Sequence, residues 1–213
     1  MVQKGITNVK LILHLQTDLK KIFPDLKKTI NHLEQEEKLE IINRTIQRPG
    51  LYHMGDVYVY PSRLDGIGLT IAEAISCGLP IIVPDTPPMN EFALSKGSEL
   101  VKISRLYSRY DGYYWPQCHI DVHDLSAKME QFVFHSDRLR QFSQNARKYA
   151  LEKLNWRKNS IDLTEILFNG EPLDFKKELS DRATKFDNRR YPGLTKNPWF
   201  YSLLAHVKRG LEK

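Results

Sequence analysis

Residues 60–85, YPSRLDGIGLTIAEAISCGLPIIVPD, combine a strand end, a glycine-bearing loop, an apolar helix and a second apolar strand. The residues just before, 56–60, read DVYVY and contain strong β formers, which predict a strand. The spacing of apolar residues predicts a helix over 69–77 that ends at Gly78 and Pro80. The β-branched run at 81–83 predicts a buried strand. This order of elements predicts one unit of a parallel α/β sheet.

The loop before the predicted helix has the composition of an anion site. The N–H groups in the first turn of a helix have no acceptors within the helix, so they can bind phosphate. Gly66 and Gly68 permit positive φ and a close approach by a ligand, and Thr70 can cap the helix or donate its hydroxyl. Asp65 and Glu73 would repel a bare phosphate, but they suit a ligand that also carries hydroxyls, as a nucleotide sugar does. The alternative is an Asp that caps the loop and a Glu on a solvated helix face.

Outside this stretch, the apolar pattern changes period repeatedly, which is typical of short strands that alternate with helices. Further strands are predicted at 9–14, 39–43 and 100–103, and further helices at 18–37, with a break at Pro24, and at 89–95. These elements predict an α/β fold with a Rossmann-like doubly wound parallel sheet.

The character of the sequence changes beyond residue 104. The pattern there predicts a Tyr-rich loop at 106–116 and helices at 122–134, 136–152 and 156–167. The tyrosines at 107, 110, 113 and 114, with Trp115, suit either stacking on a sugar acceptor or anchoring of the loop to its own domain. Residues 168–213 carry too little apolar surface for a separate domain. We therefore expect one domain over 1–167 and a helical tail over 168–213 that packs on it or on a partner.

Composition and charge exclude several classes of protein. The chain has 213 residues and a net charge of +6, and acidic residues lie among its Lys and Arg pairs, which indicates a solvated surface rather than a nucleic-acid site. No apolar run approaches a membrane span, and the first residues lack a secretory signal, so we expect a cytoplasmic protein. Both cysteines suit structural roles. Cys118, His119, Asp121 and His123 match no zinc spacing, so we expect no metal.

The glycine loop and its flanks resemble a known family. Residues 65–69, DGIGL, followed by Glu73 and Ala74, resemble the donor-binding segment of retaining glycosyltransferases of the GT-B fold, in particular the family-four group, whose signature is Glu, seven residues, Glu. The flanks at 61–63, 76–80 and 145–147 lie in the same register. Residues 8–167 follow the order of that family's C-terminal domain, so the resemblance implies the C-terminal half of a GT-B enzyme.

The resemblance also implies roles for individual residues. Glu73 would hold the donor ribose hydroxyls, and Asp65 would contact hydroxyls of the transferred sugar. Transfer in this family proceeds with retention at the anomeric carbon, usually without a bound metal or other cofactor, because protein donors stabilise the departing diphosphate. The implied donor-binding set is Gly66, Ile67, Gly68, Leu69 and Thr70 along the sugar and diphosphate, with Arg44, Thr45 and Ile46 near the base.

Three departures from the family pattern limit what the resemblance implies. Asp65 stands where the family has its first Glu, which withdraws the carboxylate by roughly 1.5 Å. Lys4 and Gly5 mimic the family's phosphate-binding Lys-Gly pair, but they lie too close to the strand at 9–14 to take that role. The acceptor-binding N-terminal domain is absent from this sequence.

We therefore expect the donor-binding half of a hexosyltransferase. Its partners would be a nucleotide sugar and an N-terminal GT-B domain on another chain, and the basic amphipathic residues 199–211 could contact a membrane surface or pack on their own sheet. One alternative is a nucleotide-sugar-binding or assembly subunit without turnover. The other is a sugar-nucleotide epimerase of the same architecture.

Overall fold

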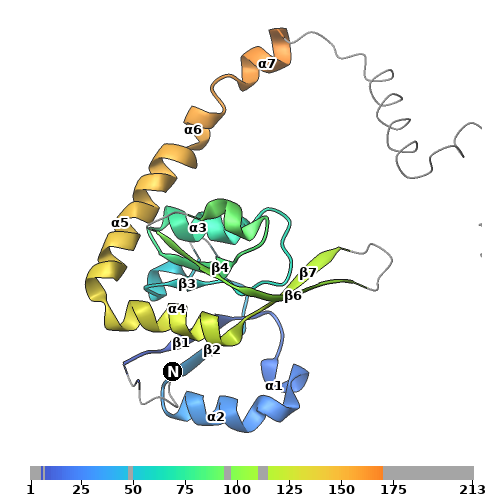
Figure 1. Cartoon of the computed structure of the whole chain (residues 1–213), viewed down its shortest axis with the longest axis vertical. Helices are drawn as coiled ribbons and strands as arrows, with labels where there is room; N and C mark the ends of the chain where they lie inside the picture. Colours follow the sequence, from blue (N-terminus) through green and yellow to red (C-terminus); the bar gives the residue numbers. More distant parts are fainter. Residues whose placement is uncertain (1–5, 7, 48–49, 94–96, 110–114, 170–213) are drawn as a thin grey trace, which may run out of the picture. The chain divides into compact units, whose positions relative to one another are not determined.

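The computed structural model describes residues 6, 8–47, 50–93, 97–109 and 115–169 (Figure 1). The chain divides into two compact units, Met1–Asn159 and Ser160–Lys213. The strands among the described residues belong to the first unit, and the described part of the second contains the helix α7, Leu163–Asn169. Most of the expected tail, residues 170–213, lies outside the described residues.

The first unit begins with a parallel strand pair. β1 (Leu11–His14) pairs with β2 (Leu39–Ile42), with Leu11 opposite Leu39. The connection contains α1 (Leu19–Ile22), the 3₁₀ turn η2 (Pro24–Leu26) and α2 (Lys27–Gln35). The expected break at Pro24 is therefore confirmed, because proline has no N–H to continue the α1 hydrogen-bond pattern.

The central sheet carries the glycine loop. β3 (Tyr58–Val59), β4 (Ile81–Pro84) and β5 (Ser98–Val101) are parallel and lie in that order. α3 (Leu69–Ser76) connects β3 to β4, and the 3₁₀ helix η4 (Met89–Phe92) follows β4, where the sequence predicted an α-helix over 89–95. The predicted strand 81–83 and helix 69–77 are thus confirmed to within one residue.

Helices cover both faces of this sheet, as a doubly wound fold requires. α4 (Val122–Phe134) and α5 (Ser136–Lys153) follow the strands (Figure 1). Alternate side chains of β4 point to opposite faces: Ile81 and Val83 pack in the core with α3 and α5, whereas Ile82 packs with Phe132 of α4 and Phe142 of α5. All three β4 side chains are at most 1% exposed, so the strand is apolar on both faces.

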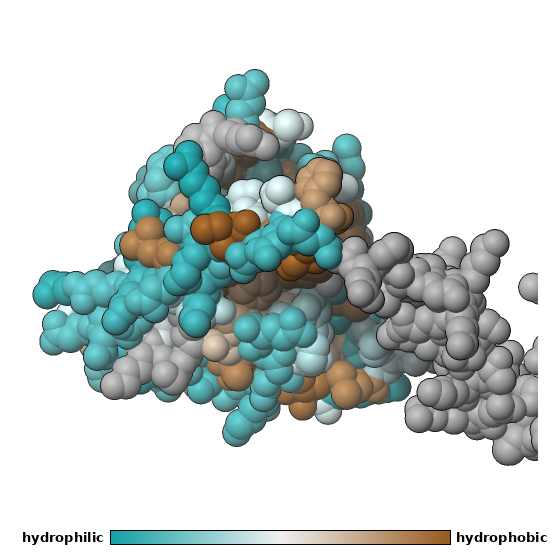
Figure 2. Space-filling view, turned by 90° about the horizontal axis from the view of Figure 1, so that it is seen from above, coloured by the Kyte–Doolittle hydropathy of each residue, from teal (hydrophilic) through white to brown (hydrophobic). Residues whose placement is uncertain are grey.

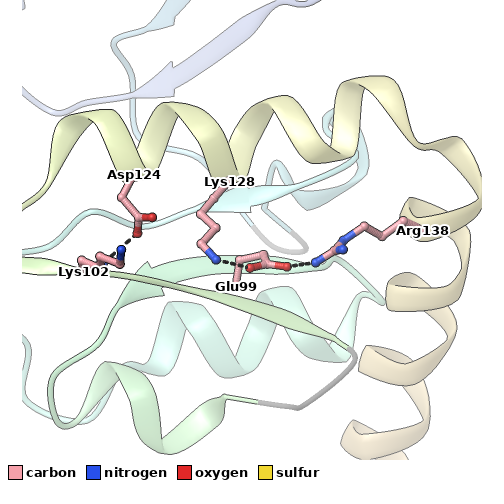
Figure 3. Close-up of polar contacts among 5 residues, drawn as sticks. All are labelled: Glu99, Lys102, Asp124, Lys128 and Arg138. Carbon is pink, nitrogen blue, oxygen red and sulfur yellow. Dashed lines mark hydrogen bonds and ion pairs between the residues drawn. The ribbon is translucent and has the colours of Figure 1, made fainter.

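A buried acid joins the helices to the edge of the sheet (Figure 3). Glu99 of β5, only 7% exposed, forms ion pairs with Lys128 of α4, at 2.9 Å, and with Arg138 of α5. The Arg138 guanidinium lies 4.8 Å from the centroid of the Phe142 ring. In the same region, the Lys102 amide donates to Asp124 Oδ2 at 2.9 Å. These contacts fix α4 and α5 against β5.

The expected loop at 106–116 is wrong in part. β6 (Ile103–Ser108) and β7 (Pro116–Ile120) form an antiparallel hairpin, and residues 110–114 between them lie outside the described residues. The β formers at 103, 107 and 120 favour strands, whereas the dense tyrosines after residue 106 favoured a loop. The predicted strand at 100–103 spans the end of β5 and the first residue of β6.

The helices after the hairpin are close to the predicted ones. α4 and α5 occupy 122–134 and 136–153, and the predicted helix at 156–167 is instead α6 (Trp156–Asn159) and, in the second unit, α7. In the described part of the chain, no helix is both long and apolar enough to cross a membrane. Apolar side chains interrupt the hydrophilic surface on the face shown in Figure 2.

Candidate functional site

The loop between β3 and α3 is shaped by one glycine. Gly68, directly before α3, has φ of 70°, in the left-handed region. A Cβ at this position would lie 3.0 Å from Phe92 Cε2 and 3.2 Å from Ile71 Cδ1. Gly66 is not among the positive-φ glycines, and a Cβ there would meet nothing within 4 Å. The positive φ that glycine permits is therefore used at 68 and not at 66, where the open space leaves room for the close approach of a ligand.

Asp65 caps this loop with its own carboxylate. Its Oδ1 accepts hydrogen bonds from the amides of Ile67, at 3.0 Å, and Gly68, at 2.7 Å. Its Oδ2 accepts a hydrogen bond from the Tyr60 hydroxyl. The Tyr60 bond, helped by the loop amides, lowers the pKa of Asp65, although partial burial opposes the shift. Asp65 is thus an ionised loop cap, and the Ile67 and Gly68 amides already donate within the loop.

Glu73 lies one turn into α3 and is exposed. Its Oε2 accepts a hydrogen bond of 2.6 Å from the hydroxyl of Tyr52, which belongs to the 3₁₀ helix η3 (Tyr52–Met54). The Tyr52 hydroxyl also lies 3.4 Å from the Thr70 carbonyl oxygen. Burial first, and then the hydrogen bond and charge of Glu73, raise the pKa of Tyr52 well above its usual value. The hydroxyl therefore stays protonated and remains a donor to Glu73.

Tyr58 of β3 lies between the two tyrosines that bind the carboxylates. Its ring stacks on that of Tyr60, with centroids 5.8 Å apart and planes 15° apart, and it meets Tyr52 edge-on, at 5.8 Å and 62°. Burial raises the pKa of Tyr58. We call Tyr52, Tyr58 and Tyr60 the tyrosine row.

The sequence analysis missed the tyrosine row. The spacing of Tyr58 and Tyr60 in DVYVY places both side chains on one face of a strand, so that pair could have been found. Tyr52 follows a turn and carried no comparable signal.

Arg44, Thr45 and Ile46 directly follow β2, as the sequence predicted for the end of that strand. The carbonyl oxygen of Arg44 lies 2.9 Å from His14 Nε2, at the end of β1. Among the described residues, no hydrogen bond joins these three to Asp65 or Glu73. Their predicted place near a nucleotide base stays a prediction.

Leu69 and Thr70 open α3 and are exposed, as is Ile67, at 63%. The amides of the first helical turn at 69 and 70 have no carbonyl one turn earlier within the helix. The structure therefore presents two exposed aliphatic side chains and a helix start beside the two carboxylates.

The base of the β6–β7 hairpin is fixed to the segment that leads to Asp65. The Cys118 amide donates to the Arg63 carbonyl at 3.0 Å, and Cys118 Sγ lies 3.5 Å from the Ser62 carbonyl oxygen. Cys118 is 1% exposed, in agreement with a structural role. Tyr107 stacks on His119, with centroids 4.6 Å apart, and Trp115 is 53% exposed. The predicted tyrosines at 110, 113 and 114 lie outside the described residues.

The described residues contain no group of three His, Cys, Asp or Glu side chains that could hold a metal ion. A groove of about 680 Å³ lies between the end of α3 and α5, lined by Gly78, Ser143 and Arg147 among others. Neither Asp65 nor Glu73 lines it. Of the two carboxylates, Glu73 is exposed and Asp65 is half-buried.

The sequence matches a known family over most of the first unit. The model of the family described as glycosyl transferases group 1 matches residues 20–149. A curated relative, the uncharacterised glycosyltransferase 335 of Sulfolobus islandicus rod-shaped virus 1, is 24% identical over 145 residues, which are 58% of this chain and 43% of the relative.

Solved glycosyltransferases have a similar fold. Sucrose-phosphate synthase from Thermosynechococcus elongatus has a TM-score of 0.59 at 17% identity, over 79% of this chain and 41% of that one. The pneumococcal O-GlcNAc transferase GtfA, solved with UDP and GlcNAc, has a TM-score of 0.55 at 21% identity, over 78% of this chain and 31% of that one. HepE from Anabaena, solved with UDP, has a TM-score of 0.58 at 16% identity, over 75% of this chain and 40% of that one. The chain thus spans less than half the length of each of these proteins.

Proposed function

The chain belongs to the glycosyl transferases group 1 family, and from that premise we propose that it is the donor-binding half of a retaining glycosyltransferase. In the proposed reaction, a hexosyl group moves from a nucleoside diphosphate to a hydroxyl of the acceptor. The bond between the anomeric carbon and the diphosphate breaks, a bond to the acceptor oxygen forms, and the acceptor proton leaves with the diphosphate. We propose that no metal is required.

One observation carries this proposal: two carboxylates flank a glycine loop that opens directly into a helix. Asp65 precedes the left-handed Gly68, and Glu73 lies one turn into α3. Two similar folds, HepE and GtfA, were solved with UDP, which supports a nucleoside diphosphate as the ligand. The helix start would face the diphosphate, and the carboxylates would accept hydrogen bonds from ribose and sugar hydroxyls.

The two carboxylates differ in how many hydrogen-bond acceptor positions they have left for a ligand. A carboxylate offers about four acceptor positions. Asp65 uses three of them for Ile67, Gly68 and Tyr60, whereas Glu73 uses one for Tyr52. Glu73 therefore has the larger remaining capacity and is the better candidate for the ribose.

A second candidate function is a nucleotide-sugar-binding subunit without turnover. The observation that favours it is the same engagement of Asp65, because a carboxylate that caps its loop has little capacity left for the transferred sugar. In either case the proposed partner is an acceptor-binding domain on another chain. The expected membrane contact concerns residues outside the described part, and the cytoplasmic location stays a prediction.

Calorimetry with UDP, GDP and ADP, each with and without an attached glucose, tests the donor assignment. We expect one nucleoside diphosphate to bind and Glu73→Gln to weaken it by about five- to a hundredfold, because two charge-assisted hydrogen bonds to the ribose become neutral ones, at about 1–3 kcal/mol. Asp65→Asn should chiefly affect the sugar conjugate.

Glu152→Gln is the matched control, since Glu152 is an exposed helical acid on α5. It should leave the affinity unchanged. Failure of every nucleotide to bind the wild-type chain would refute the donor assignment, and equal affinities for wild type and Glu73→Gln would refute the role of Glu73.

A further inference from the structure

Two members of the tyrosine row contact the two carboxylates of the candidate site. The Tyr52 hydroxyl donates to Glu73 Oε2 at 2.6 Å, and the Tyr60 hydroxyl donates to Asp65 Oδ2. The ring of Tyr58 contacts the rings of both. Both carboxylates that the sequence singled out for ligand binding are therefore hydrogen-bonded by members of one row of aromatic rings.

The rings themselves are held in place by the sheet and the core. The Tyr58 amide donates to the Pro80 carbonyl and the Tyr60 amide to the Ile82 carbonyl, each at 2.9 Å. The rings of the row contact one another, and all three pack against the core cluster that contains Ile71 and Ile75 of α3. A hydroxyl on a packed ring has few positions, so its partner's position is restricted as well.

We propose that Tyr52 and Tyr60 are positioning residues that fix the orientation of Glu73 and Asp65 for the donor, with the ring of Tyr58 packed between theirs. This inference rests on the proposed function, because it assigns the carboxylates to a nucleotide sugar. The two carboxylate-binding tyrosines then have different roles. Tyr52 orients Glu73 for the nucleotide, and Tyr60 orients Asp65 for the sugar.

Tyr60 has a particular role because Asp65 is short. The aspartate is about one carbon–carbon bond, roughly 1.5 Å, shorter than the glutamate that the family pattern has there. Its Oδ1 is occupied by the loop amides, so the side chain presents Oδ2, the oxygen that Tyr60 contacts. The phenol oxygen has lone pairs and can itself accept from a sugar hydroxyl while it donates to Asp65. Tyr60 and Asp65 together thus offer the sugar the acceptor oxygens that one longer carboxylate would offer.

The electrostatics of the row agree with a permanent donor role. Burial raises the pKa of Tyr52 and Tyr60 above the ordinary value of about 10, and the hydrogen bond that each donates to its carboxylate raises it further, although Ser62 opposes the shift at Tyr60. Both hydroxyls therefore lose their protons at a higher pH than an unshifted tyrosine and remain donors at neutral pH.

The test measures affinities for UDP and UDP-glucose, or for the corresponding GDP or ADP pair where that nucleotide binds, with Tyr52→Phe and Tyr60→Phe. We expect Tyr52→Phe to weaken both ligands by about two- to tenfold, as the loss of one hydrogen bond predicts. Tyr60→Phe should weaken the sugar conjugate by a similar factor and leave the free nucleotide unchanged. Tyr149→Phe, on α5 against the same core, is the control and should change neither affinity.

Double-mutant cycles distinguish positioning from general destabilisation. If Tyr52 acts through Glu73, the phenylalanine change should have no further effect on affinity in a Glu73→Gln background. Full additivity of the two changes would overturn the inference for Tyr52, as would wild-type affinity in Tyr52→Phe. Equal losses of free nucleotide and conjugate in Tyr60→Phe would overturn the role of Tyr60.

A pH series completes the experiment. The ratio of wild-type to Tyr52→Phe affinity should stay level between pH 8 and about pH 10, since any titration of the nucleotide base affects both proteins alike, and a fall in this ratio would contradict a protonated donor. If no nucleotide binds the wild-type chain, the proposed function fails and the positioning role fails with it. Nucleotide binding that is unchanged in Tyr52→Phe and Tyr60→Phe refutes the positioning role and leaves the proposed function in place.

Discussion

At the scale of single residues, the two glycines of the loop differ in whether a larger side chain would fit. Gly68 is left-handed, and a Cβ there would approach Phe92 Cε2 to 3.0 Å, whereas Gly66 has open space around it. We expect Gly68→Ala to destabilise the chain by at least about 1 kcal/mol, because an L-residue in this region costs roughly 1–2 kcal/mol before any displacement of Phe92.

Gly66→Ala is the matched control and should change the free energy of unfolding by less than about 0.5 kcal/mol. Urea unfolding of both variants measures the difference. Equal stabilities would mean that the loop adopts another backbone conformation in solution.

At the same scale, the sequence supported two roles for Asp65, a loop cap and a ligand for hydroxyls. The hydrogen bonds from the Ile67 and Gly68 amides show that Asp65 caps the loop. Its role as a ligand for hydroxyls stays a prediction. The spacing of Asp65 and the amides after it carried the capping signal, since Asp commonly bonds amides two and three residues on. The bond from Tyr60 depends on tertiary packing around β3 and could not be predicted from that spacing.

At the scale of elements, local signals predicted the structure well where they were strong. Pro24 ended a helix as its chemistry requires, and Gly78 and Pro80 marked the end of α3. The β6–β7 hairpin was missed because its strands contain an arginine, two serines and a histidine. The strands are stabilised by pairing with each other and by the Cys118 bond to Arg63. Such pairing between segments is not visible in local composition.

The Glu99 ion pairs make a prediction about how the helices are held. Removal of the charge in Glu99→Gln leaves Lys128 and Arg138 facing a neutral amide beside a buried strand. We expect a loss of about 1–3 kcal/mol, less than for a fully buried pair, because Arg138 and Lys128 keep partial access to water.

Glu152 forms an exposed pair with Lys148 at 4.0 Å, and Glu152→Gln should cost less than about 0.5 kcal/mol. Chemical unfolding monitored by circular dichroism at 222 nm compares the two variants. A Glu99→Gln chain as stable as wild type would show that α4 and α5 are held by apolar packing alone.

At the scale of the whole molecule, the proposed site consists of an exposed Glu73 beside a half-buried Asp65. The chain spans 43% of its viral relative. Rate enhancement in group transfer depends on holding two reactants together and on stabilising the leaving group. The described site offers hydroxyl acceptors and a helix start, but it supplies no wall for the acceptor.

We therefore expect the purified chain to bind its nucleotide sugar and to consume very little of it. Donor consumption would be followed by chromatography of the released nucleoside diphosphate, with and without extracts that contain hydroxyl acceptors. Glu73→Gln serves as the background, because hydrolysis that does not involve the site would be equal in both proteins. Addition of a separately expressed N-terminal GT-B domain should raise consumption only if that domain docks on the face beside Asp65 and Glu73. Efficient transfer by the chain alone would show that it binds its own acceptor, and the exposed aromatic residue Trp115 on the hairpin side would then be the first position to substitute.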